Sequence, residues 1–391
     1  MGKGPLHGIK VLDLSAYIAG PYACSLLADL GAEVIKVEPP TGDTLRQYPS
    51  TLAEEGRAFL GVNRSKRGIV IDLKNAEGLG VLKRLVAGAD VLVHNFRPSV
   101  APRLGIDYAA LKAVKPDLIY CILTGYGQSG PLAAKAGYDQ VLQSITGICT
   151  FQGLGSGEPE IVYGSVVDFY AAALLSNAVC AALFHRQKSG EGQALSVSLL
   201  GAALAMQATR FVWADGEPRE IGRDMRSGGI TGIHPCAAGT SIYISANTPH
   251  FWKALCERIE APALASNPDY DTVRKRAERA DEIVPALRVA LQKHTALEWE
   301  KIFGEAVPNG AVRAIEDMFD DPQVQHQGYV AHFEHPKVGY RSLSGAFDFD
   351  GNEKPDAFAA PAQGQHTDAI LAEHGYGADE IKSLRGNGAV S

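Results

Sequence analysis

The chain has 391 residues, of which 46% are apolar and 21% are charged. This composition is typical of a folded protein, and the length predicts two or three domains. The net charge of −7 disfavours a general binding surface for nucleic acids or anionic membranes. We therefore expect small-molecule partners, with no nucleic acid and no membrane.

The six cysteines are widely spaced and form neither a C-x-x-C pair nor a cluster with histidines, so the sequence predicts no disulfide framework and no metal site. Residues 1–7 lack the apolar stretch of a signal peptide. The apolar run Val166–Phe184 contains Asp168 and continues into His185, which favours a buried core helix over a membrane span. These features predict a reduced, cytoplasmic protein.

The first 125 residues alternate short β-branched runs with segments of helical spacing. This alternation predicts a doubly wound, Rossmann-like α/β domain with a mainly parallel sheet. The expected strands are Lys10–Leu14, Glu33–Glu38, Ile69–Leu73, Val91–Phe96 and Leu118–Thr124, and the expected helices include Ala76–Ala87 and Pro98–Val114. Ligands of such sheets bind at the carboxyl ends of the strands. The segments expected there are Ser15–Pro21, Glu38–Gly42, Asn95–Pro98 and Gly125–Pro131.

The pattern changes after residue 165, and it predicts a second, smaller α+β domain. A long helix at Val166–Arg186, a strand at Ala194–Ser198 and a helix at Leu199–Ala214 end the first part of the large domain, residues 1–214. Residues 215–232 read as a linker loop, 233–319 as the small domain, and 320–391 as a return segment that completes the large domain. The later expected elements are Ser241–Ala246, Phe251–Arg258, Arg274–Lys293, Leu297–Phe303, Tyr340–Phe349 and Thr367–His374.

A glycine motif follows the fifth expected strand. Gly125, Gly127 and Gly130 fit G-x-G-x-x-G, but Pro131 stands where a dinucleotide-binding helix would begin, so the motif does not predict a nicotinamide site. These glycines would still allow backbone N–H groups to approach a ligand closely.

Asp168 is the charged residue in the first turn of the long apolar helix. Two interpretations are open and compatible. Asp is a favoured helix N-cap, and a carboxylate partly desolvated by apolar neighbours can also serve as a nucleophile or base.

Basic residues occur in two groups. The first group, Arg57, Arg64, Lys66 and Arg67, is expected to form a solvated surface. Arg97 and Arg103 follow a strand end, where a phosphate group would bind in this type of sheet. No H-E-x-x-H or G-x-S-x-G motif supports a metalloprotease or a hydrolase.

Taken in order, several segments resemble the class III CoA-transferases, the family of formyl-CoA transferase and carnitine CoA-transferase. They cover nearly the whole chain: Gly8–Leu14, Ala19–Pro21, Leu30–Glu38, Ala89–Pro98, Gly125–Pro131, Gly137–Gln140, the Asp168 helix, Lys188–Gln193 and Gly364–Asp368. The resemblance implies that Asp168 is a nucleophile that forms an aspartyl anhydride and then an aspartyl-CoA thioester. It also implies an interlocked homodimer, coenzyme A or acyl-CoA as the substrate, and no metal, flavin or NAD.

The resemblance also implies contacts with the cofactor. The positions that match the family's CoA-binding segments are Ala16, Tyr17, Ile18, Leu73, Lys74, Asn95, Phe96, Arg97, Arg103 and Tyr138. Positions considered for the acid substrate are Gly127, Arg226, Gly228 and Gly229. Arg223 and Arg226 favour a C4–C5 dicarboxylate such as itaconate or mesaconate as acceptor from a donor such as succinyl-CoA, although solvated loop arginines are the plainer interpretation.

Departures from the family's patterns leave alternatives. Formyl-CoA transferases carry His, Gln and Arg where this chain has Ala16, Ile18 and Pro39, which argues against formyl or oxalate specificity. The α-methylacyl-CoA racemases share the fold and carry His-Asp where this chain has Tyr138-Asp139, and a tyrosine of ordinary pKa is a poor replacement for histidine as an acid or base. A catalytically silent acyl-CoA-binding protein is a further alternative.

Overall fold

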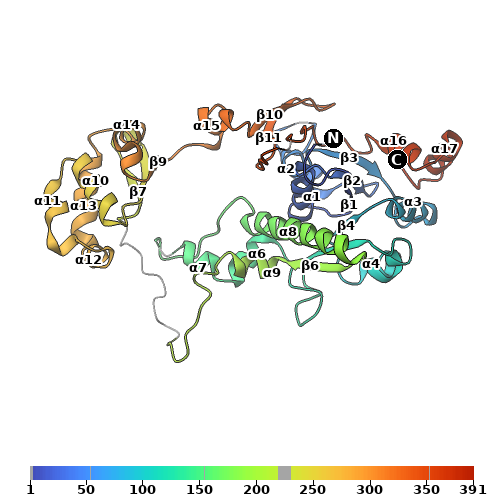
Figure 1. Ribbon diagram of the computed structural model, residues 1–391, viewed down its shortest axis with the longest axis horizontal. Coiled ribbons are helices and arrows are strands. Elements are labelled where there is room, and N and C mark those ends of the chain that lie inside the picture. The colour runs from blue at the N-terminus through green and yellow to red at the C-terminus, as the bar shows by residue number, and fades with distance from the viewer. Residues whose placement is uncertain (1–2, 53, 154, 219–229, 352) are drawn as a thin grey trace. The chain divides into compact units, whose positions relative to one another are not determined.

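Six parallel strands form the central sheet of the larger unit (Figure 1). The computed structural model describes residues 3–52, 54–153, 155–218, 230–351 and 353–391. The strands are β1 (Lys10–Asp13), β2 (Glu33–Glu38), β3 (Lys66–Val70), β4 (Val91–His94), β5 (Ile119–Thr124) and β6 (Ala194–Ser198), in the order β3-β2-β1-β4-β5-β6. The α/β prediction with a parallel sheet is confirmed. Because the order reverses between β1 and β4, their carboxyl ends form the crevice in which such sheets bind ligands.

Strand β3 begins at Lys66, three residues before the start that the sequence predicted, and Lys66 pairs with Val34 of β2. The Lys66 side chain is fully buried, and its ammonium donates to Asp13 Oδ2 at 2.8 Å and to the Pro21 carbonyl at 2.6 Å. Arg64 is equally buried and pairs with Asp29. The expectation of a solvated surface is therefore wrong for Arg64 and Lys66, because partners distant in the sequence compensate their charges, whereas Arg57 is exposed.

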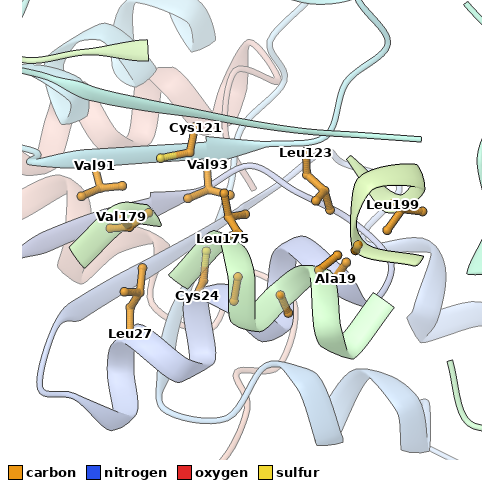
Figure 2. Packing of buried hydrophobic residues seen from close by; sticks show 14 of the residues in the cluster. Ala19, Cys24, Leu27, Val91, Val93, Cys121, Leu123, Leu175, Val179 and Leu199 are labelled. Carbon is orange, nitrogen blue, oxygen red and sulfur yellow. The ribbon is translucent and has the colours of Figure 1, made fainter. Parts of the chain in front are cut away.

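Helices cover both faces of the sheet. On one face lie α1 (Ala19–Asp29) and α8 (Val166–Ser189), and Figure 2 shows Leu175 and Val179 of α8 beside Val93 of the sheet and Cys24 of α1. The core on the other face includes α3 (Ala76–Ala87), α16 (Thr367–Glu373) and α17 (Ala378–Gly386).

Among the described helices, α8 is long and apolar enough to cross a membrane. The buried core helix of a soluble protein can have the same length and composition. Val167, Leu175 and Val179 are fully buried in the core, whereas Phe169 and Phe184 on the same helix are exposed. The helix therefore packs on the sheet with one side and presents a second apolar side outward.

The expected helix Pro98–Val114 is two short helices, α4 (Val100–Leu104) and α5 (Tyr108–Lys112). Gly105 ends α4 in the left-handed conformation with φ 66°, and the Asp107 carboxylate then caps α5. The remaining helices of the larger unit are η1 (Thr44–Gln47), α2 (Arg57–Val62), α6 (Asp139–Ile145), α7 (Ile148–Gln152), α9 (Leu199–Ala205) and α15 (Pro322–His326).

The chain divides into two compact units, Met1–Val212 with Pro322–Ser391, and Trp213–Asp321. Most of the expected linker, residues 219–229, lies outside the described residues. The second unit holds an antiparallel sheet of β7 (Gly232–Pro235), β8 (Ser241–Ile244) and β9 (Asn309–Ala311). Its α-helices are α10 (Pro249–Arg258), α11 (Pro262–Ser266), α12 (Val273–Glu278), α13 (Ala280–Leu291) and α14 (Ala296–Phe303).

The chain's last segment returns to the larger unit. It forms an antiparallel pair, β10 (Val330–Phe333) with β11 (Tyr340–Leu343), and then runs to the edge of the parallel sheet. There the N–H of Gly68 donates to His366 Nδ1 at 3.0 Å, and the N–H of Asp72 donates to the Ala389 carbonyl at 2.9 Å. These bonds satisfy backbone groups that the edge strand β3 would otherwise expose.

Candidate active site

A cavity of about 450 Å³ opens at the carboxyl ends of β1 and β4. Its wall combines the turn after β1, the segment after β4, the loop before α6 and the first turn of α8. Eight of the residues singled out from the sequence line it, namely Ala16, Tyr17, Ile18, Asn95, Phe96, Arg97, Tyr138 and Asp168. The structure thus brings together residues that are up to 152 positions apart in the chain.

The turn after β1 is fixed by Asn95. Its side-chain oxygen accepts the N–H of Ala16 at 3.0 Å, and its side-chain nitrogen donates to the Ala16 carbonyl at 2.7 Å. Tyr17 follows in the left-handed region, with φ 65°, and its N–H donates to Asp43 Oδ1 at 3.4 Å. Asn95 therefore shapes the cavity wall with its amide group.

Asp168 lies in the first turn of α8, and this helix begins directly after Gly164 and Ser165, which both adopt positive φ. The N–H groups that begin the helix are taken by another carboxylate, since Asp139 Oδ2 accepts from Val167 at 2.6 Å and from Asp168 at 3.1 Å. The N-cap interpretation of Asp168 is wrong, because Asp139 fills that role from α6. No described residue donates a hydrogen bond to the Asp168 carboxylate, which is left to face the cavity.

Burial raises the pKa of Asp168 to about 7, and the negative charge of Asp139 adds to this shift. At neutral pH the carboxylate therefore exists partly in the protonated form. A carboxylate without hydrogen-bond donors is also a stronger base and nucleophile than a solvated one. The site thus holds a reactive acidic group with its solvation reduced.

Tyr138 contacts Tyr17 in the wall of the cavity, with ring centroids 5.8 Å apart and the rings nearly perpendicular. Hydrogen bonding to Tyr17 raises the pKa of Tyr138 above its ordinary value. Tyr138 therefore keeps its proton at neutral pH, and Asp139 next to it is buried and bonded to helix α8. This pair does not supply the second acid/base group that a racemase needs.

The segment after β4 carries the cationic side of the cavity. Phe96 stacks on His94, with centroids 5.1 Å apart, and the exposed Arg97 lines the cavity beside it. His94 itself is a structural residue, because burial lowers its pKa to about 4 and its Nε2 is hydrogen-bonded to Tyr120.

Four other expected contacts do not line this cavity. Leu73 is half-buried in the core beyond β3, the N–H of Lys74 is bonded to Asp72, and Arg103 is exposed on α4. The N–H of Gly127 donates to Thr124 Oγ1 at 2.9 Å, so it is not free to stabilise an oxyanion. Arg223, Arg226, Gly228 and Gly229 lie outside the described residues.

The glycine motif has a structural role at its first position. A Cβ on Gly125 would lie 2.7 Å from the Gly137 Cα, so only glycines allow the two ends of the 126–136 loop to approach so closely. This approach brings Lys135 to the cavity wall.

Sequence reasoning missed Asp43 and the cavity residues Tyr48 and Lys135, and it considered Asp139 only within the racemase pattern. Asp139 is an acidic residue at the start of helix α6, but it accepts hydrogen bonds from the first N–H groups of α8. The sequence alone does not place these two helices side by side. Within the described ranges, no group of three or more His, Cys, Asp and Glu side chains could hold a metal ion.

Residues 6–367 match the model of the family described as CoA-transferase family III. The chain is 33% identical over 380 residues to human succinyl-CoA:glutarate CoA-transferase, covering 94% of this chain and 86% of that protein. It is 36% identical over 343 residues to succinate–glutarate CoA-transferase of Agrobacterium fabrum, covering 83% and 84%. The crystal structure of a CAIB/BAIF family protein from Brucella suis superposes with a TM-score of 0.82 at 28% identity, over 95% of this chain and 100% of that one.

The extent of these matches agrees with the parallel sheet and with the cavity that contains Asp168 and Asn95. The chain belongs to CoA-transferase family III and is a class III CoA-transferase.

Proposed function

We propose that the protein moves CoA from succinyl-CoA, or a similar acyl-CoA donor, to a short dicarboxylic acid through covalent intermediates on Asp168. The observation that carries this proposal is the Asp168 carboxylate, which faces the cavity while Asp139 occupies the helix N–H groups beside it. The names of two relatives pair succinyl-CoA or succinate with glutarate. We therefore propose glutarate as the preferred acceptor acid. Itaconate and mesaconate, which also have five carbons, are the next candidates.

The reaction begins with attack of the ionised Asp168 carboxylate on the thioester carbonyl of the donor. A C–O bond forms and the C–S bond breaks, which gives a mixed anhydride and the CoA thiolate. The thiolate then attacks the Asp168 carbonyl, releases the donor acid and leaves an aspartyl-CoA thioester. Covalent catalysis thereby divides one difficult exchange into steps of similar energy.

The acceptor acid completes the cycle by the reverse sequence. Its carboxylate attacks the aspartyl-CoA thioester and expels the thiolate, and the thiolate then attacks the acceptor's carbonyl in the new anhydride. The products are the acceptor's CoA thioester and the free Asp168 carboxylate. No proton is gained or lost, so the enzyme needs no general acid or base once Asp168 is ionised.

Two cationic side chains support the binding of anionic substrates. Arg97 and Lys135 both line the cavity and both are exposed. Guanidinium and ammonium groups bind phosphates and carboxylates through charge-assisted hydrogen bonds. We propose that Arg97 binds a phosphate of CoA and that Lys135 attracts the acid.

The nucleophile assignment is tested by Asp168→Asn, which keeps the shape of the side chain and removes the nucleophilic oxygen. We expect CoA exchange between succinyl-CoA and glutarate to fall by at least ~10³-fold, since loss of a covalent nucleophile has effects of this size or larger. Asp368→Asn, an exposed position on α16, is the matched control and should retain the wild-type rate. A folded Asp168→Asn variant with near wild-type exchange contradicts the proposal, and deuterium uptake at the α-carbon without exchange would favour a racemase.

We also propose that two copies of the chain form the interlocked homodimer that the family resemblance implies. The outward side of α8 supports this, because Phe169 and Tyr170 expose apolar surface beside Asp168, and Phe184 exposes more near the other end of the helix. Light scattering on the purified protein should give twice the chain mass of 41.6 kDa. A monomer at micromolar concentration would contradict the proposal.

A further inference from the structure

A network of buried charges lies beneath the turn after β1, and the reaction above does not use it. Lys36 donates to Asp43 Oδ2 at 2.9 Å and to the Ser15 carbonyl at 2.5 Å. The N–H of Asp43 donates in turn to Glu38 Oε2 at 2.9 Å. Lys36, Glu38 and Asp43 are all at least 98% buried.

This network ends at Tyr17. Asp43 Oδ1 accepts the N–H of Tyr17, while Asn95 binds both backbone groups of the preceding Ala16. Tyr17 is one of five described residues other than glycine with positive φ, a conformation that persists only where the surroundings impose it. The backbone of Tyr17 is therefore held from both sides before any substrate binds.

The Tyr17 ring lines the cavity that contains Asp168, and it meets Tyr138 edge to face. An acyl group attached to Asp168 has to extend into this cavity. Because the bonds of Tyr17 to Asp43 and of Ala16 to Asn95 fix the Cα–Cβ direction of Tyr17, its ring can leave the path of a long acyl chain only by changing rotamer and giving up its contact with Tyr138.

We propose that Tyr17 is a specificity-determining residue that limits the chain length of the dicarboxylic acid, and that Asp43 is its positioning residue. This inference rests on the proposed acylation of Asp168. It identifies the substrate class as short dicarboxylates that fit in the cavity beside the Tyr17 and Tyr138 rings, which contact each other.

The test compares kcat/KM for glutarate, adipate and pimelate with succinyl-CoA as the donor. The variant is Tyr17→Asn, because asparagine tolerates the left-handed conformation and lacks the ring. We expect the pimelate-to-glutarate ratio of kcat/KM to rise by about tenfold or more, the usual effect of one or more methylenes in an apolar pocket. Tyr17→Phe keeps the ring and should keep the wild-type ratio, whatever its absolute rates.

The positioning role of Asp43 is tested in the same assay. Asp43→Asn keeps an acceptor oxygen and removes the charge beside Lys36, so it should shift the ratio in the same direction as Tyr17→Asn but by less. Tyr376→Ala is a matched control, because it removes a tyrosine ring that stacks under Arg84 and does not line the cavity. It should leave the ratio unchanged.

Two results would overturn the inference. The first is that Tyr17→Asn and Asp43→Asn both keep the wild-type rates and the wild-type pimelate-to-glutarate ratio of kcat/KM. The second is that Tyr17→Asn loses rate equally with all three acids, so that the ratio again stays unchanged, which would assign Tyr17 to the chemistry and not to the selection of the acid. Mass spectrometry on the same variants separates this failure from that of the proposed function. If Asp168 still becomes acylated while the ratio is unchanged, only the role of Tyr17 is wrong.

Discussion

Two buried or partly buried aspartates of the larger unit lie in opposite electrostatic environments. Asp13, at the end of β1, is fully buried, and although burial alone would raise its pKa, Lys36 and Lys66 hold the pKa below its ordinary value. Asp168, at the start of α8, has no cation beside it among the described residues, and burial together with the charge of Asp139 raises its pKa to about 7. The comparison shows how one fold neutralises a structural carboxylate and leaves a second one available for chemistry.

The largest expected effect concerns Asp13, whose negative charge is compensated by Lys36 and Lys66. Lys66→Met removes the closer of the two cations beside Asp13, so that the buried carboxylate keeps the hydrogen bonds from Ser15 but only the longer 3.8 Å ion pair with Lys36. We expect a loss of about 3–5 kcal/mol in the free energy of unfolding, as for other broken buried ion pairs. Urea denaturation measures this, with the exposed Lys382→Met on α17 as control. Equal stability of the two variants would show that the Asp13 pair contributes little.

The next effect concerns Asp168, which lacks a neighbouring cation in the part of the chain that the structure describes. Only the ionised form of Asp168 can attack the thioester, so the rate of acylation should rise with pH and level off above about 7, the raised pKa of this group. Asp139→Asn removes the neighbouring negative charge while keeping an oxygen for the helix N–H groups. We expect the midpoint of the pH profile to fall by roughly one unit, which makes acylation below the midpoint about tenfold faster at a given pH.

Single-turnover acylation, followed from below the midpoint to above it, measures this shift. Asp368→Asn again serves as the control and should keep the wild-type midpoint. An unchanged midpoint in Asp139→Asn would mean that burial alone sets the pKa of Asp168.

The smallest expected effect is the change that Asp168→Asn makes in the pH dependence of the free energy of unfolding. Because the pKa of Asp168 is higher in the folded state than its ordinary value of 3.8, the folded state binds the proton more tightly. This group's destabilising contribution therefore appears as the pH rises from about 4 and is complete above about 7. Asp168→Asn should stabilise the protein by about 1 kcal/mol at alkaline pH, after allowance for partial solvent exposure, and not at acidic pH. Thermal unfolding at both extremes checks this, and a stabilisation independent of pH would contradict it.

The sequence predicts the elements whose pattern is local. Helix Ala76–Ala87 and strand Ala194–Ser198 have the bounds that the sequence indicated, because their apolar periodicity and flanking turn residues act within the segment itself. The long helix starts at Val166 as expected, and its exposed apolar side did not disturb that prediction.

Features that depend on distant partners were not predictable in this way. Lys66 looked solvated because its partner Asp13 is 53 residues away, and only the parallel pairing of the strands brings the two together. Asp168 looked like a helix cap because nothing local shows that Asp139, 29 residues earlier, caps the same helix. The positive φ of Tyr17 likewise depends on other segments, because Asp43 binds its N–H and Asn95 binds the preceding Ala16.

The most direct test of the account is to trap the enzyme during turnover and to weigh its peptides. Succinyl-CoA is added to the wild-type protein, the reaction is quenched within the first turnover, and the peptide that contains Asp168 is analysed by mass spectrometry. We predict a succinyl adduct or a CoA adduct on Asp168. When excess glutarate is present long enough for the acids to exchange, a glutaryl adduct should replace the succinyl adduct, while the CoA adduct, which both acids share, should remain. An active enzyme that never carries an adduct on Asp168 would contradict the account.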